Sequence, residues 1–184
     1  DLYVGGWFVA SGTGGGAETI RRIGKWDGSN WSEVGSGIGE YQVYSLGVGN
    51  GYLYVGGTFT IVTGLGGGNH VAQWDPVNGS WSTLGSGAAD GVNSTVHGIG
   101  VRGNRVYLGG GFGIAGGVDI TQDYVAYWDT AALTWNELSG SGGPTSEVFA
   151  LVVADNGDVY VGGNGFVKKW VNGTWSSFTV SGGT

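Results

Sequence analysis

The amino-acid sequence predicts an all-β protein, and three observations carry that prediction. Glycine occupies 43 of 184 positions, while nine Trp, nine Tyr and six Phe supply the aromatic side chains that pack well on sheets. Apolar residues alternate with polar ones over short segments, which is the period of a strand, and glycine or Asn-Gly turns separate those segments. No segment shows a convincing helical period, so we expect negligible helix.

Three linked signatures recur four times along the chain. An aliphatic-Tyr-aliphatic-Gly-Gly block places tyrosines 51, 53 and 53 residues apart, at Tyr3, Tyr54, Tyr107 and Tyr160. A first tryptophan column follows at Trp26, Trp74, Trp128 and Trp170, and a second at Trp31, Trp81, Trp135 and Trp175. This recurrence predicts four copies of one supersecondary unit. The repeats span residues 1–51, 52–104, 105–157 and 158–184.

Each complete repeat is predicted to contain four antiparallel strands, which we name A to D in chain order. Strand A covers residues 43–48, 96–101 and 148–153, strand B is the tyrosine block, strand C ends at the first Trp, and strand D begins at the second. The A–B links contain Asn50-Gly51, Gly103-Asn104 and Asn156-Gly157, which tolerate the positive φ angles of two-residue hairpins. The double glycines are expected where strand B meets a neighbouring aromatic ring or adopts φ angles closed to other residues. The first repeat begins at strand B and has no strand A.

The pattern resembles the kelch repeat of β-propellers, which has a period of about 50 residues and four antiparallel strands. The segment Val71-Ala72-Gln73-Trp74-Asp75-Pro76-Val77-Asn78-Gly79-Ser80-Trp81 is similar to the kelch motif, with Trp where kelch usually has Tyr. The Leu-Tyr-Val-Gly-Gly-x-Phe form also resembles propeller repeats of large secreted or surface bacterial proteins. The resemblance implies a β-propeller of four-stranded blades whose first blade lacks its innermost strand. We expect a segment of a larger propeller, or an assembly that covers its open ends.

Charge and composition exclude several classes of partner. Seven basic and 14 acidic side chains give a net charge of −7 without a basic block, so a nucleic-acid partner is not expected. The absence of cysteine excludes disulfides, thiolate metal sites and cysteine nucleophiles. No apolar run approaches the length of a membrane span, so membrane insertion is not expected. Low charge and abundant Gly, Ser and Thr favour an extracellular or cell-surface location.

The longer links are the predicted location of a ligand site. The B–C and D–A links lie on one face of an up-and-down blade, and they are longer than the A–B and C–D links of the other face. Function concentrates on such links. The candidate ligand-binding residues are Trp7, His70, Asp90, Asp119, Asp123 and Tyr124. Trp7 stands outside the two tryptophan columns, which are themselves predicted to pack between blades.

No catalytic residue, transition metal or cofactor is predicted. The oxidase relatives of kelch propellers hold copper with His, Tyr and a Cys cross-linked to Tyr, whereas this chain has two His and no Cys. His97 occupies the position of Tyr44 and Phe149 and is expected to be a packed ring. Calcium bound through oxygens of Asp119, Gln122 and Asp123 is possible in principle, although no EF-hand spacing is present.

The sequence therefore favours a non-catalytic extracellular binding or adhesion module that presents its long links to a glycan or protein ligand. One alternative is a structural subunit of a surface layer, sheath or filament, in which propellers contact further blades or copies of themselves. A second alternative is a glycan-active enzyme with paired carboxylates, whose separation a sequence does not give. Sequons for N-glycosylation stand at Asn30, Asn78, Asn93 and Asn172.

Overall fold

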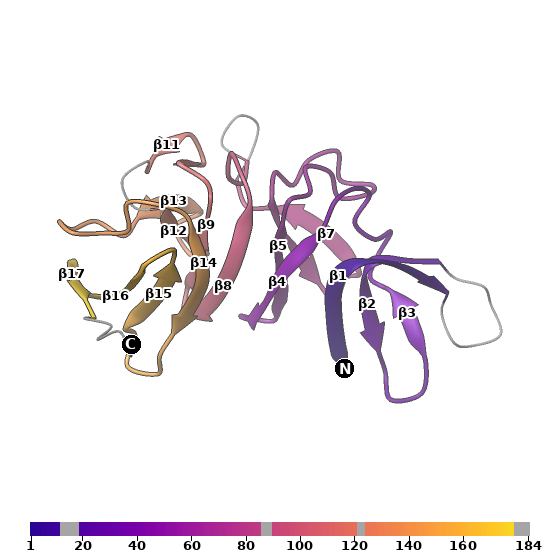
Figure 1. Cartoon of the computed structure of the whole chain (residues 1–184). Coiled ribbons are helices and arrows are strands. Elements are labelled where there is room, and N and C mark those ends of the chain that lie inside the picture. Colours follow the sequence, from indigo (N-terminus) through magenta and orange to yellow (C-terminus); the bar gives the residue numbers. More distant parts are fainter. Residues whose placement is uncertain (12–18, 86–89, 121–123, 179–184) are drawn as a thin grey trace.

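The computed structural model describes residues 1–11, 19–85, 90–120 and 124–178, and within them every regular element is a β-strand (Figure 1). All strand pairings are antiparallel. The all-β prediction is thereby confirmed. Within the described residues, no helix is long and apolar enough to cross a membrane.

Four main sheets follow one another along the chain, each built from one continuous stretch of sequence. The first sheet contains β1 (Leu2–Ser11), β2 (Thr19–Trp26) and β3 (Trp31–Glu33). The second contains β4 (Val43–Gly49), β5 (Tyr52–Gly57), β6 (Val71–Asp75) and β7 (Ser80–Thr83). The third contains β8 (Val96–Arg102), β9 (Arg105–Gly110), β12 (Val125–Asp129) and β13 (Thr134–Glu137). The fourth contains β14 (Val148–Val153), β15 (Val159–Gly163), β16 (Phe166–Val171) and β17 (Thr174–Ser177).

The strands lie close to their predicted positions, and one small hairpin is additional. The hairpin β10 (Ile114–Ala115) and β11 (Val118–Asp119) forms inside the predicted B–C link of the third sheet. The first sheet begins its strand order with β1, the sequence counterpart of β5, β9 and β15. Among the described residues, it therefore has no counterpart of β4, β8 and β14.

The turn residues Asn50 and Gly51 explain the tight hairpin between β4 and β5, the first two strands of the second sheet. Asn50 and Gly51 have φ angles of 55° and 83°, which matches the two central residues of a type I′ hairpin. The Asn50 side-chain amide also donates a hydrogen bond of 2.8 Å to the carbonyl of Gly103, in the corresponding turn of the third sheet. The predicted Asn-Gly hairpin is present, and it ties two sheets together.

Hydrophobic clusters fill the three spaces between consecutive sheets, which we call seams. Ile23, Val55 and Phe59 belong to the cluster of the first seam. Tyr54 and Leu108 belong to the second, and the third has a cluster of its own. The two faces of one strand thus serve two seams, because neighbouring residues Tyr54 and Val55 point to opposite sides of β5.

The double glycines allow the sheets to approach each other closely. A Cβ atom on Gly56 would lie 2.6 Å from Cγ1 of Val96, and one on Gly109 would lie 2.7 Å from Cγ1 of Val148, across the next seam in each case. A Cβ on Gly57 would collide with the backbone carbonyl of Gln42 in its own sheet. None of these three glycines has a positive φ. The nearest neighbours of these three glycines are valines and a peptide group, whereas the predicted aromatic neighbours occur at Gly110, beside Phe112, and at Gly163, beside Phe166.

A β-bulge interrupts the leading strand of each four-stranded sheet. The register shifts between Val43 and Ser45, and equivalent shifts occur in β8 and β14. The extra residues are Tyr44, His97 and Phe149, and their rings form a row with centroid separations of 5.3 and 5.5 Å. A bulge redirects its extra side chain, so the three rings gather along the adjacent leading strands. His97 is a packed ring in this row, as the sequence predicts.

Candidate functional site

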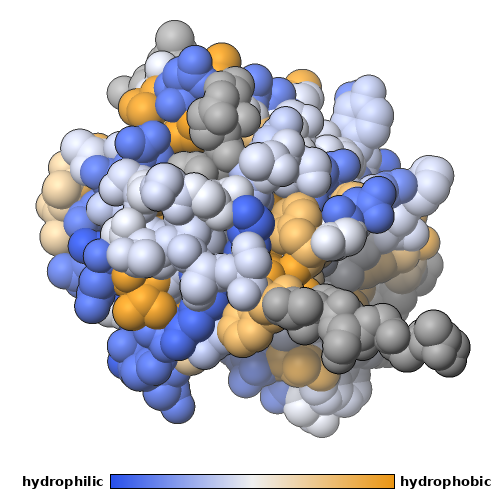
Figure 2. All heavy atoms as spheres, turned by 60° about the vertical axis from the view of Figure 1, so that its left-hand side comes forward, coloured by the Kyte–Doolittle hydropathy of each residue, from blue (hydrophilic) through white to orange (hydrophobic). Residues whose placement is uncertain are grey.

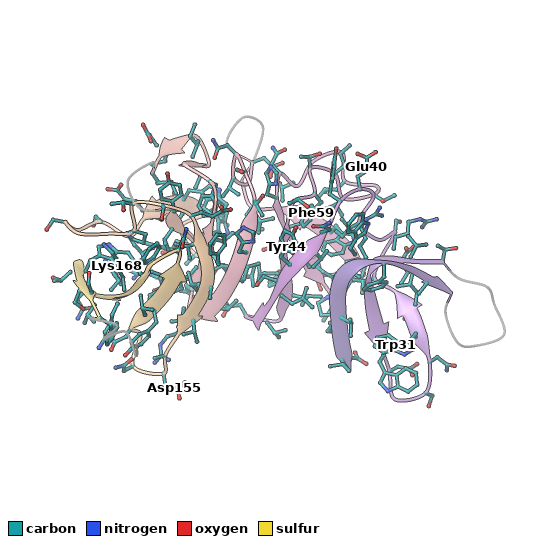
Figure 3. The ribbon with its side chains drawn as sticks, in the orientation of Figure 1. Trp31, Glu40, Tyr44, Phe59, Asp155 and Lys168 are labelled. Carbon is teal, nitrogen blue, oxygen red and sulfur yellow. The ribbon has the colours of Figure 1, made fainter. Side chains whose placement is uncertain are left out.

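Links of different length gather at opposite edges of the sheets. Glu40, in the link that leads from the first sheet to the second, lies at one edge, and Asp155, in the β14–β15 turn, lies at the other (Figure 3). Within the described residues, a pocket at the long-link edge is lined by one link of the second sheet, one link of the third sheet, and the segment that joins the two sheets. The predicted residues His70 and Asp90 meet there.

This pocket, which we call the His70–Asp90 cavity, has a volume of about 280 Å³. It lies where the β5–β6 link, the segment before β8 and the β10–β11 hairpin come together. Its lining consists of Asn69, His70, Asp90, Gly91, Val92, Asn93, Ile114, Gly116 and Gly117. Most of these residues offer peptide or side-chain polar groups, so the cavity is suited to a small polar molecule.

Backbone and amide hydrogen bonds fix the walls of the cavity. Val92 donates its N–H to the carbonyl of Asn69 at 3.1 Å, and the Asn69 side chain donates to the carbonyl of Asp90 at 3.2 Å. The Asn93 carboxamide oxygen accepts the backbone N–H groups of Gly113 and Ile114, both at 3.0 Å. Links from two sheets are thereby joined around the cavity.

His70 owes its position to a backbone feature that recurs in three sheets. The residue four positions before the first-column tryptophan has a positive φ angle in each case, with 63° at Arg22 within β2, 62° at His70 just before β6, and 51° at Tyr124 just before β12. The carbonyls of His70 and Tyr124 accept the N–H of the second glycine of the pair, at 3.0 and 3.2 Å. The backbone conformation therefore carries the structural role, and the side chain at this position is free to differ.

Two buried polar atoms of the cavity residues have no hydrogen-bond partner among the described residues. They are Nδ1 of His70 and Oδ1 of Asp90. The other carboxylate oxygen of Asp90 accepts the backbone N–H of Gly68 at 3.1 Å. Burial raises the pKa of Asp90 above its usual value and lowers the pKa of His70. Because such unpaired groups are costly, a bound polar molecule that supplied the missing partners would be stabilised.

The remaining predicted residues fall in different places. Asp119 lies on β11 directly across from Ile114, which lines the cavity, so it stands beside the site. Tyr124 packs against the cluster of the third seam, and Trp7 lies on β1 with 77% of its surface exposed. Asp123 lies outside the described residues. The structure therefore brings together His70 and Asp90, with Asp119 nearby, and separates Trp7 and Tyr124 from them.

Sequence reasoning missed a larger cleft at the short-turn edge. Its volume is about 680 Å³, and it is lined by Arg102, Gly103, Asn104, Arg105, Tyr107, Asp129, Asn156, Gly157, Asp158, Trp170 and Asn172. Its charged groups already have partners. Lys169 lies 2.6 Å from Asp158, and the Arg105 guanidinium lies 4.6 Å from the ring centroid of Tyr127. No lining residue carries a buried polar atom without a partner, so we regard the smaller His70–Asp90 cavity as the better candidate.

Metal coordination has no cluster to support it in the part of the chain that the structure describes. No group of three His, Asp or Glu side chains there could hold an ion together. The calcium hypothesis included Asp119, Gln122 and Asp123, and the latter two residues lie outside the described ranges.

Comparisons with known proteins show a shared fold. No protein-family model and no curated protein matches the sequence. The extracellular domain of a B. thetaiotaomicron protein, described as a hybrid two-component system, matches over 98% of this chain and 22% of its own, with 13% identity and a TM-score of 0.62. A second structure, an extracellular domain described as a one-component system from the same organism, has 13% identity and a TM-score of 0.60 over 99% of this chain.

A designed protein is also similar. The computationally designed Ika8 protein matches 94% of this chain and 48% of its own, with 19% identity and a TM-score of 0.55. The chain spans 22% and 23% of the length of the two extracellular domains, which is less than a quarter of each. At these identities the likeness is one of fold alone.

Proposed function

We propose that this chain is a non-catalytic, extracellular binding module of the kelch-like β-propeller type, and that its His70–Asp90 cavity holds a small hydroxyl-rich ligand such as a sugar residue of a glycan. One observation carries the proposal. Two residues that line the polar cavity at the long-link edge, His70 and Asp90, each carry a buried polar atom that has no partner among the described residues.

The chemistry of the lining favours hydroxyl groups. A hydroxyl both donates and accepts, so it can satisfy the Asp90 oxygen and an imidazole nitrogen of His70 whichever tautomer the ring adopts. The described part of the lining contains no lysine or arginine, which favours a hydroxyl-rich ligand over a phosphate or carboxylate. Its volume of about 280 Å³ lies at the small end of the range for ligand pockets, which is consistent with one sugar ring.

A binding role is supported over catalysis by the number of carboxylates. Among the described residues, Asp90 is the one acidic residue in the lining of the cavity. Glycoside hydrolysis usually requires a pair of carboxyl groups that flank the scissile bond.

The propeller type and the location have separate support. Four successive antiparallel sheets, whose leading strands β4, β8 and β14 lie next to one another, are the arrangement expected of propeller blades. Two structures that share the fold are extracellular domains. A polar surface with a net charge of −7 suits a protein exposed to solvent on all sides.

A glycan array followed by calorimetry tests the proposal. We expect the chain to bind a defined glycan class, and we expect His70→Asn and Asp90→Asn each to weaken binding at least tenfold while the fold is kept. Asparagine tolerates the positive φ of His70, so the first variant removes the ring without straining the backbone.

Asp155→Asn is the matched control, because it removes the same charge from the exposed opposite edge. It should bind as the wild type does. Glycan binding that is unchanged in both cavity variants, or no binding to any glycan on the array, would contradict the proposed function.

A further inference from the structure

A leucine occupies a backbone position that favours glycine. Leu133, in the turn between β12 and β13, has a φ angle of 56°, and Gly79 holds the same position in the second sheet with a φ of 64°. The hydrogen bonds of the two turns also match. Leu133 donates its N–H to the carbonyl of Asp129 at 2.8 Å, and Gly79 donates to that of Asp75 at 2.9 Å. The Cβ of leucine crowds the backbone in this left-handed region, so its presence there points to a role for the side chain.

The side chain of Leu133 lines an apolar hollow of about 300 Å³. Leu133 is 69% exposed, and Val118 of β11, which also lines the hollow, is 42% exposed. The buried Trp128 and Trp135 provide the rest of its large apolar side chains. All four residues belong to the third sheet or to the hairpin within its β9–β12 link, and this sheet has a neighbouring sheet on each side.

Figure 2 turns the third and fourth sheets toward the viewer, and hydrophobic side chains reach the surface there in separate groups among hydrophilic ones.

The hollow adjoins the His70–Asp90 cavity at the turn of the β10–β11 hairpin. Gly116 lines both spaces, and a Cβ built on it would collide with the ring of Trp135. Gly117, the other residue of the turn, lines the cavity, and no described atom lies within 4 Å of a Cβ built on it. The turn therefore separates a polar space from an apolar one without placing a side chain of its own between them.

We propose that the hollow is the second part of the ligand site, and that the ligand is a glycoside with an apolar aglycone. The sugar ring lies in the His70–Asp90 cavity, and the aglycone crosses the turn Gly116-Gly117 to lie against Leu133. This inference rests on the proposed function and names the class of its ligand. It also gives a reason for a leucine where the backbone favours glycine, because the leucine side chain supplies contact area that glycine lacks.

The lining of the hollow favours an apolar group over a second sugar ring. Thr134 supplies the one hydroxyl group of the described lining, and the other side chains are aliphatic or indole groups. The hydroxyls of a second sugar ring would leave water without finding new partners there, which costs free energy. An aryl or alkyl group instead gains free energy in proportion to the apolar area that it removes from water.

Titration calorimetry with matched glycosides tests the inference. The probes are the methyl, phenyl and octyl glycosides of glucose, galactose, mannose and N-acetylglucosamine, which differ within each sugar only in the aglycone. For at least one sugar, we expect the phenyl or the octyl glycoside to bind about tenfold more tightly than the methyl glycoside. The comparison of phenyl with octyl then tells whether the preferred aglycone is aromatic or aliphatic.

Leu133→Asn separates a role in binding from a role in the fold. Asparagine tolerates a positive φ, so this variant should unfold at the same temperature as the wild type or at a higher one. It should bind the methyl glycoside as the wild type does, and it should lose the additional affinity for the aglycone. His70→Asn should instead weaken the binding of all three glycosides by a similar factor, because it changes the part of the site that holds the sugar.

Val77→Asn is the matched control, since it makes a similar change at an exposed residue of the corresponding turn in the second sheet, and it should keep every affinity. Val118→Ser should also reduce the contribution of the aglycone, and it replaces Leu133→Asn if circular dichroism shows that the latter does not fold. The inference is wrong if the methyl, phenyl and octyl glycosides of each sugar bind equally, or if Leu133→Asn keeps the full preference. In both cases the proposed function stands. If none of these glycosides binds, the inference is overturned, and the glycan array decides the proposed function separately.

Discussion

Trp135 donates its indole N–H to the backbone carbonyl of Leu84 at 2.8 Å, across 51 residues of sequence. The bond links the last strand of the third sheet to the end of the last strand of the second. The ring itself is buried and packs 5.4 Å, centroid to centroid, from Trp128. The second tryptophan column therefore has a polar function as well as an apolar one, since it sets the distance between consecutive sheets.

Trp135→Phe should lower the stability of the chain by roughly 1–3 kcal/mol, because the Leu84 carbonyl loses its indole partner inside a seam. Thermal unfolding followed by circular dichroism measures the loss. Trp31→Phe is the control, and it should leave the midpoint almost unchanged because Trp31 makes no such bond among the described residues. Equal losses in the two variants would show that the indole bond does not matter.

A matched series of glycine variants tests the close approach between the first glycine of each pair and a valine of the next sheet. Gly56→Ala and Gly109→Ala should destabilise the protein, because the new methyl groups would lie 2.6 and 2.7 Å from valines of the next sheet. Gly162→Ala should be neutral or stabilising by up to about 1 kcal/mol, since its Cβ meets no described atom and alanine restricts the unfolded chain. Urea unfolding gives the three values, and a loss at Gly162 equal to that at Gly56 contradicts the seam.

Acid should destabilise the turns between the last two strands of the first three sheets. Asp27, Asp75 and Asp129 each accept two backbone N–H groups, which lowers the pKa of each carboxyl below its usual 3.8. A group with a lowered folded pKa contributes stability above its unfolded pKa, and that contribution is lost as the pH falls through the folded pKa. The loss is therefore expected below about pH 4.

The triple variant Asp27→Asn, Asp75→Asn and Asp129→Asn should weaken this acid dependence, since asparagine keeps the acceptor oxygen but does not titrate. Urea midpoints measured through the acid range compare it with Asp155→Asn. If the triple variant follows the wild-type curve, the three carboxylates do not stabilise the turns.

His70 should give the protein a second pH dependence, nearer neutrality. Burial lowers the folded pKa of His70 below 6.5, so the unfolded chain binds a proton first and stability falls as the pH drops from 6.5 through the folded pKa. His70→Asn should remove this slope, and unfolding midpoints between neutral and mildly acidic pH measure it. Identical slopes in the wild type and the variant would show that His70 titrates normally.

The repeat architecture could be predicted because its signals are local. The tyrosine block and the turn Asn50-Gly51 define strands and hairpins within a few residues of themselves. The hairpin of β10 and β11 escaped prediction because its strands have two residues each, and its turn consists of Gly116 and Gly117, both at positive φ. A pattern with period two cannot be recognised over so short a length.

The candidate site could be predicted only in part, because it depends on contacts between sheets. His70 and Asp90 were both named from their long links, but their meeting follows from the bond between Val92 and Asn69, which no spacing reveals. A usable signal was present in the alignment of the repeats. Arg22, His70 and Tyr124 each stand four residues before a tryptophan of the first column. A recurring polar or aromatic residue at this place, beside a glycine-rich link, indicates a backbone position with positive φ.

The continuity of each sheet in sequence has a consequence for how the chain folds. Every main sheet forms from neighbouring hairpins, so the entropy lost in closing its loops is small and each can form before distant segments arrive. The hydrophobic clusters of the seams stabilise a sheet only when the neighbouring sheet has also formed. Refolding of the whole chain can therefore begin in any sheet and spread to its neighbours. During synthesis, the first sheet can form before the later ones have left the ribosome.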